Sequence, residues 1–152
     1  MNSHRVAGFY RILWLAGIGL AGCGGGSGAP ELAPAGGCLT YRGNPLANAL
    51  VTFASESGAR ISYSTTDKFG RYQLGTFRPG DGAVVGKQRV TVVAQGPRRL
   101  PPSGTLGAGM PGGPSLPGLP LIPEKYFDPA TSGLTAEVHA GASNVFDIEL
   151  VD

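Results

Sequence analysis

Short runs in which apolar and polar residues alternate are the feature that most constrains the fold of this chain. Turns rich in glycine, proline, asparagine and aspartate separate these runs, and the sequence shows no amphipathic helix between them. Alternation with a period of two gives each run one buried face and one solvated face. We therefore expect an all-β fold with seven strands, at residues 37–42, 46–55, 59–65, 71–77, 87–94, 133–140 and 144–151.

The alternation also predicts which side chains enter the core. In the second run Val51 and Phe53 point to the same face, which we expect to be buried. Tyr41, Tyr63 and Tyr72 fit the core better than an exposed aromatic platform. Two sheets packed through such faces would form an antiparallel β-sandwich of immunoglobulin-like proportions.

A segment rich in proline and glycine, residues 96–123, interrupts the strand pattern. The chain of 152 residues is long enough for one domain with a modest core, and its 26 glycines and 13 prolines favour turns over helices. Two interpretations of the segment remain open. Prolines at every third position would align along one edge of a polyproline II helix and could dock into an aromatic groove. The interspersed glycines favour a disordered loop insertion between two strands. The regularly spaced prolines are Pro111, Pro114, Pro117, Pro120 and Pro123.

Residues 1–22 have the organisation of a secretory signal peptide. A weakly basic segment precedes an apolar stretch from 12 to 22, which is shorter than the roughly 20 residues that span a bilayer. This stretch ends in LAGC, which resembles the lipobox of bacterial lipoproteins and places its cysteine at Cys23. The resemblance implies cleavage before Cys23 and lipidation of its thiol and amine. The alternative is an ordinary secreted cysteine near a cleavage site.

The mature chain is expected to begin with a glycine-rich tether, residues 23–35, followed by the domain, residues 36–152. Of the 12 Lys and Arg residues, Arg5 and Arg11 leave with the leader, and the remainder equals the 10 Asp and Glu residues. A neutral chain without a cationic run has no electrostatic footprint for nucleic acid. If the host has two membranes, the lipoprotein resemblance favours the outer one, because Gly24 rather than aspartate follows the cysteine.

Two stretches of the expected domain resemble the carboxypeptidase regulatory-like, or transthyretin-like, domain of bacterial surface proteins. They are TYRGNPLANALVTFAS, residues 40–55, and STTDKFGRYQLGTFRPGDGAVVGKQRVTVVA, residues 64–94. Residues 122–138 also look like the end of such envelope lipoproteins. The resemblance implies a seven-stranded prealbumin-like sandwich, a module that is usually non-catalytic and assists folding, adhesion or assembly.

One turn in the second stretch has a clear physical interpretation. The Asp67 carboxylate can cap the turn, Gly70 can supply a positive φ, and Tyr72 then re-enters the core. These three residues therefore have a structural role in this prediction.

Few residues after the leader are suited to catalysis or metal binding. His139 is expected on a solvated strand face beside Glu137, where a lone histidine is more often a surface residue than a general base. Asp67, Asp81 and Asp128 lie in predicted turns, but calcium takes about six to eight oxygen ligands and the sequence contains no dense acidic loop.

Cys38 is the cysteine that remains after Cys23. It has no partner for an intramolecular disulfide, and one cysteine does not make a tetrahedral zinc site. Its alternation with Leu39 places it on the face of Thr40, where we expect a partly exposed thiol.

These observations predict a lipid-anchored, non-enzymatic binding or assembly module of the cell envelope. No cofactor or metal is expected. The expected partners are the membrane, through Cys23, and an envelope protein or polysaccharide, with no nucleic acid. The alternative is a small hydrolase, or a metal-dependent carbohydrate-binding accessory protein, that would use His139 or the loop carboxylates.

Overall fold

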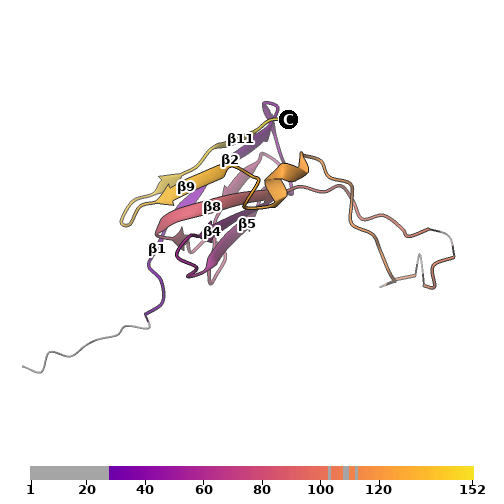
Figure 1. Cartoon of the computed structure of the whole chain (residues 1–152), viewed down its shortest axis with the longest axis horizontal. Coiled ribbons are helices and arrows are strands. Elements are labelled where there is room, and N and C mark those ends of the chain that lie inside the picture. The colour runs from indigo at the N-terminus through magenta and orange to yellow at the C-terminus, as the bar shows by residue number, and fades with distance from the viewer. Residues whose placement is uncertain (1–27, 103, 108–109, 112) are drawn as a thin grey trace, which may run out of the picture.

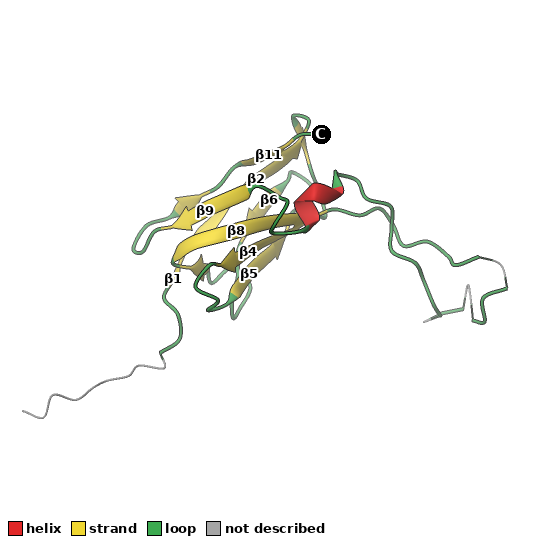
Figure 2. Ribbon diagram, in the orientation of Figure 1, coloured by secondary structure: helices red, strands yellow, loops and turns green. Residues whose placement is uncertain are grey.

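The computed structural model describes residues 28–102, 104–107, 110–111 and 113–152, so the expected leader and Cys23 lie outside the described residues. The described part is an all-β fold, as the alternation predicted, with one short 3-10 helix, η1 (Glu124–Phe127) (Figure 2). The strands are β1 (Leu32–Ala33), β2 (Ala35–Tyr41), β3 (Asn44–Pro45), β4 (Leu50–Ser55), β5 (Ile61–Thr65), β6 (Arg71–Gln73), β7 (Ala83–Val84), β8 (Gly86–Val93), β9 (Leu134–Val138), β10 (Asn144–Val145) and β11 (Ile148–Leu150).

The strands of the described residues form three sheets rather than the expected pair. One sheet has the order β5-β4-β8-β9 and is antiparallel throughout. A second sheet is centred on β2, which pairs with β3, β6, β10 and β11, and a third joins β1 to β7. The seven expected runs thus become eleven strands, because the run 144–151 divides into β10 and β11, and the short strands β1, β3 and β7 lie outside the expected runs.

The expectation of a wholly antiparallel fold is wrong at β2. Both β10 and β11 run parallel to β2, with Asn144 opposite Ala35 and Leu150 opposite Tyr41. The pattern of alternation is the same in parallel and antiparallel strands, so only the tertiary structure decides the direction. The last strands of the chain therefore close the sheet beside the first long one.

The folded part begins before residue 36, inside the segment expected to be a tether. Leu32 pairs with Val84, and the amide of Val85 donates to the Glu31 carbonyl at 2.9 Å. Ala33 and Ala35 are buried in the core. The tether predicted at 23–35 thus overlaps the fold by several residues.

The core lies between the β4-containing sheet and the β2-containing sheet. Val51 and Phe53 are fully buried, as the alternation predicted. The ring of Phe53 lies 6.5 Å from the ring of Tyr72 and 5.5 Å from that of Phe146, both carried by the other sheet or its margin. These contacts pack the two sheets against each other through their apolar faces.

The segment 96–123 leaves after β8 and returns at η1. Near its root the two arms pair, since Arg99 and Leu116 exchange backbone hydrogen bonds of 2.9 and 2.8 Å. Figure 1 shows the segment extending away from the strands, at the end of the molecule opposite to the point where the chain enters β1. The return to the fold places Ile122 and Tyr126 in the core. Within the described ranges no helix is long and apolar enough to cross a membrane.

Candidate functional site: a groove between β5 and β6

The orientation of β5 is the largest difference between the expected and observed surfaces. Tyr63 was expected in the core but is 59% exposed, while its neighbour Ser62 is fully buried. Pairing decides this, because Ser62 lies opposite Phe53 of β4 and therefore shares its inward face. The buried Ser62 hydroxyl is satisfied by the Thr76 hydroxyl at 2.7 Å and by the Val84 amide at 3.3 Å.

The reversed strand exposes a groove between β5 and the segment that follows β6. One wall is formed by residues 63–65, and the other by Gln73 and residues 75–79, around a cavity of about 220 Å³. A shallower cavity of about 510 Å³ adjoins it and shares Thr65 and Gln73 in its lining. We call these two adjoining cavities the β5–β6 groove.

The backbone beneath the groove is a hairpin whose ladder of hydrogen bonds lacks one pair of bonds within the described residues. We call the position of this missing pair the open rung. Tyr63 and Gly75 exchange two hydrogen bonds, of 2.9 and 3.0 Å, and the Asp67 amide donates to the Arg71 carbonyl at 2.9 Å. Between these closed rungs Thr65 stands opposite Gln73. Among the residues that the structure describes, no backbone hydrogen bond joins these two.

Along a β-strand, the N–H and C=O groups of successive residues point to opposite sides, and this shows where the backbone groups of Thr65 and Gln73 point. The Thr66 amide bonds to β4, through the Ala49 carbonyl, so the N–H and C=O of Thr65 point away from β4. The Leu74 amide bonds to Ala35 of β2, so the N–H and C=O of Gln73 point away from β2. Both sets of groups therefore face the groove.

Two aspartates shape the loops around the groove. Asp81 accepts hydrogen bonds from the amides of Thr76 at 2.7 Å, Arg78 at 2.9 Å and Phe77 at 3.1 Å, and these amides lower the pKa of its carboxyl. Asp67 accepts from two amides of its own turn, at 2.8 and 2.9 Å. Both carboxylates are thus engaged with backbone, and the Asp67 turn confirms the predicted cap.

The prediction for the rest of that turn is also confirmed. Gly70 has a φ of 74°, and Tyr72 is buried. The Tyr72 hydroxyl donates to the Phe146 carbonyl at 2.6 Å, and burial, the largest cause, raises its pKa far above the usual value. The turn therefore carries the chain from the groove into the core.

Cationic side chains lie over exposed aromatic rings beside the groove. The Arg60 guanidinium lies 4.8 Å from the centre of the Phe77 ring. The Lys68 ammonium lies 4.8 Å from the centre of the Phe69 ring, and the Arg71 guanidinium 5.9 Å from it. Such contacts orient a cation over an aromatic face without neutralising its charge.

Among the described residues these cations have no carboxylate partner. The ion pairs within the described ranges are Arg42–Asp152 and Arg89–Glu56, neither of which involves the groove. Arg78 lines the first cavity and Arg71 the second, one on each side of the open rung. The groove therefore offers positive charge, an aromatic surface and free backbone groups together.

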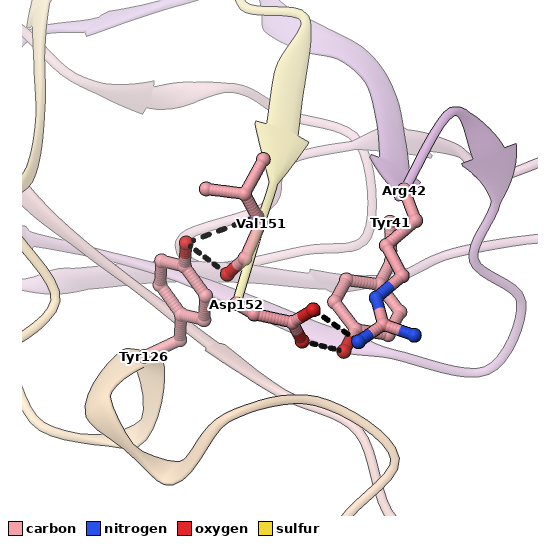
Figure 3. A network of polar contacts seen from close by, with 5 residues as sticks. All are labelled: Tyr41, Arg42, Tyr126, Val151 and Asp152. Carbon is pink, nitrogen blue, oxygen red and sulfur yellow. Dashed lines mark hydrogen bonds and ion pairs between the residues drawn. The ribbon is translucent and has the colours of Figure 1, made fainter.

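A second polar cluster, shown in Figure 3, lies where the chain ends. We call it the C-terminal latch and define it as Tyr41, Arg42, Tyr126, Val151 and Asp152. The Asp152 carboxylate accepts from the Tyr41 hydroxyl at 2.6 Å and pairs with the Arg42 guanidinium, and these contacts lower its pKa. The Tyr126 hydroxyl donates to the Val151 carbonyl at 2.8 Å and accepts from its amide at 3.1 Å.

The structure scatters the other candidate residues of the sequence. His139 is exposed just after β9, and its backbone amide and carbonyl bond to the Asn144 side chain at 2.9 and 3.1 Å. Asp128 accepts from the Ala130 amide at 2.7 Å in its own turn. Cys38 is half-buried, with its amide donating to Asp147 at 2.9 Å. In the described part of the chain, no three His, Cys, Asp or Glu residues gather as metal ligands would.

Sequence reasoning missed the groove because it assigned Tyr63 inward and did not consider Phe69 or Phe77. A signal was present in the sequence. Lys68-Phe69 places an aromatic residue beside a cation in a turn without a strand face to bury it, and Phe77-Arg78 places another at the end of the expected strand 71–77. Tyr126 was also missed, since it is buried in η1.

Comparisons with protein families, curated proteins and solved structures find no significant match. The fold and the groove define a class of protein. It is an all-β protein with an open, cationic and aromatic groove at the edge where two sheets diverge.

Proposed function

We propose that this protein is a non-enzymatic binding module of the cell envelope, held at a membrane by lipid on Cys23. The observation that carries the proposal is the β5–β6 groove, in which Tyr63 and Phe77 are exposed and, within the described ranges, Arg71 and Arg78 lack carboxylate partners. Unpaired charge and exposed aromatic surface together are typical of recognition sites.

The anchor rests on the sequence of the leader. An apolar stretch that ends in LAGC is the pattern of a lipoprotein signal. One acyl chain holds a protein at a membrane only marginally, whereas two or more give stable anchoring. Lipid at Cys23 would then leave few residues before β1, so the domain would stand close to the membrane.

The fold of the proposed module is a transthyretin-like sandwich. Support comes from the two sheets that share one core around Phe53, and from the stretches 40–55 and 64–94, which resemble such domains. Small domains of this kind present loops and strand edges to partners from a rigid scaffold. The groove lies at such an edge.

The arrangement along the molecule suits a partner outside the membrane. The chain enters at β1 at one end, and the segment 96–123 extends from the other (Figure 1). Its exposed apolar side chains add to the surface that a protein partner could cover. They are Leu100, Leu106, Met110, Leu116, Leu119 and Leu121.

The second candidate is a carbohydrate-binding accessory protein, favoured by the exposed rings of Tyr63 and Phe77. Its metal-dependent version would draw on Asp67 and Asp81, whose carboxylates are engaged with backbone amides. A hydrolase would use His139, which does not line the groove.

Photo-crosslinking in intact cells tests the proposal. A photoreactive phenylalanine analogue at Phe77 should capture one reproducible envelope component, whereas the same analogue at the exposed Val145 of β10 should not. Equal capture from both positions, or none from Phe77, would contradict a binding site in the groove.

Fractionation tests the anchor separately. Wild-type protein should sediment with membranes, and Cys23→Ser should appear in the soluble fraction. Cys38→Ser is the matched control and should fractionate like wild type. Unchanged fractionation of the Cys23 variant would rule out the anchor while leaving the groove unaffected.

A further inference from the structure

We propose that the β5–β6 groove binds the free carboxyl terminus of a peptide, with the last amide of that peptide at the open rung between Thr65 and Gln73. The inference rests on the proposed binding function and specifies the ligand of the same site.

The open rung is complementary to a single peptide group. Thr65 and Gln73 each direct an N–H and a C=O towards the groove, and neither bonds to the other strand. A ligand amide supplies one donor and one acceptor, so it satisfies two of these four groups, and a terminal carboxylate can accept from a further N–H. Completing the ladder in this way is the chemistry of β-strand recognition of peptides.

The closed rungs limit how much ligand backbone can enter. Tyr63 with Gly75 closes one side of the opening, and Asp67 with Arg71 closes the other. A long strand laid along β5 would have to break these hydrogen bonds. The end of a chain meets no such obstacle, because it needs only one backbone position.

The charges favour a terminus that ends in a carboxylate. Arg78 and Arg71 lie on either side of the open rung, and neither forms an ion pair within the described residues. The two acidic side chains nearby, Asp67 and Asp81, are held by backbone amides. An arginine can bind a carboxylate through two parallel hydrogen bonds.

The side chains of the first cavity suit an apolar last residue. The exposed rings of Tyr63 and Phe77 border a space of about 220 Å³. A leucine side chain is small enough for such a space and would gain contact with both rings. Its carboxylate would then lie on the Arg78 side of the opening.

The test uses the full chain and three synthetic probes. Ac-Ala-Ala-Leu with a free carboxylate should bind, and the same peptide with a carboxamide end should bind about tenfold more weakly or worse, because a charge-assisted hydrogen bond is lost. A third peptide, N-methylated at its last amide, should also lose binding, because it cannot donate at the open rung. Amide chemical shifts of Thr65 and Gln73 should change on binding.

Variants locate the effect in the groove. Arg78→Gln should weaken binding of the free-acid peptide about tenfold and leave the weaker binding of the carboxamide peptide unchanged. Arg42→Gln and Arg89→Gln, which remove paired arginines elsewhere, are matched controls and should bind like wild type. Circular dichroism of each variant checks that the fold is intact.

Three results would overturn the inference. The first is equal binding of the acid and the carboxamide peptides. The second is that the amide chemical shifts of Thr65 and Gln73 do not change on binding. The third is that an N-acetylated, carboxylate-bearing oligosaccharide binds and none of the three peptides does. If crosslinks form at Phe77 in cells but no peptide binds, the proposed binding function stands and only the choice of ligand fails.

Discussion

The β5–β6 groove and the C-terminal latch use the same kinds of residue in opposite ways. In the latch, Asp152 is paired with Arg42 and hydrogen-bonded by Tyr41. In the groove, the aspartates bind backbone amides, and Arg71 and Arg78 pair with no carboxylate in the part of the chain that the structure describes. The latch satisfies its charges internally, whereas the arginines of the groove form no ion pair among the described residues.

This difference separates a cluster with paired charges from the groove that we propose as a recognition surface. A paired surface charge contributes little to stability and presents little net field. An unpaired cation beside an aromatic ring keeps its field and its hydrogen-bond donors. Residue type alone would not distinguish the two regions. The partners of each residue do.

The largest expected effect comes from removing the core that both regions share. Phe53 is fully buried and contacts the rings of Tyr72 and Phe146. Phe53→Ala should lower the free energy of unfolding by about 3–5 kcal/mol, because it removes buried surface and leaves a cavity. Denaturant unfolding would measure this, with the exposed Ile61→Ala as the control. A loss below about 1 kcal/mol would show that the two sheets do not depend on this contact.

The next effect should fall on the groove alone. Gly75→Ala places a Cβ against the carbonyl oxygen of Arg78 and the amide of Gly80, and both are backbone atoms that do not give way easily. We expect a loss of about 1–3 kcal/mol in stability from this overpacking. Crosslinking from Phe77 should also be lost.

Position 28 provides the comparison for that variant. A Cβ at Gly28 meets nothing within 4 Å, so Gly28→Ala should change neither stability nor crosslinking. If Gly75→Ala kept both properties, the groove would not depend on the observed path of residues 75–80.

A smaller effect should fall on the latch alone. Tyr126→Phe removes a buried hydroxyl that both donates to and accepts from Val151. We expect the free energy of unfolding to fall by about 1–2 kcal/mol, since the Val151 groups lose their partner. Peptide binding and crosslinking at Phe77 should be unchanged. A defect in binding would mean that the two regions are coupled.

The smallest effect should be a dependence of stability on pH. The pKa of Asp152 lies below the usual value of 3.8 because of the Tyr41 hydroxyl and the Arg42 guanidinium. A carboxyl with a lowered pKa in the folded state stabilises the fold above its unfolded pKa, and this contribution disappears as the pH falls through the folded-state pKa. Asp152→Asn should therefore flatten the decline of stability below about pH 4.

The dependence of stability on pH in an Asp81 variant sharpens the comparison between the groove and the latch. The pKa of Asp81 is lowered by backbone amides, the Thr76 amide above all, so Asp81→Asn should flatten the same acid range. Unlike Asp152→Asn, it should also weaken capture at Phe77, because asparagine keeps only one of the two acceptor oxygens that hold the loop that carries this residue. Equal effects of both variants on capture would remove the distinction between the regions.

The elements that could be predicted from sequence depend on local chemistry. The Asp67 turn, the positive φ of Gly70 and the inward faces of Val51 and Phe53 are confirmed, because each follows from a residue and its near neighbours. The groove was not predicted, since it needs Tyr63 to face outward. That orientation depends on which residue of β4 lies opposite β5.

The sequence by itself determined the all-β character, through alternation and turns, and it supports the predicted lipid anchor, which stays a prediction. Only the tertiary structure decided that β10 and β11 run parallel to β2, and that Thr65 and Gln73 face each other without bonding. The physical reason is that the alternation of apolar and polar residues does not specify the direction of a strand or the strand with which it pairs. Long-range pairing sets both, and the open rung lies where β5 joins one sheet and β6 the other.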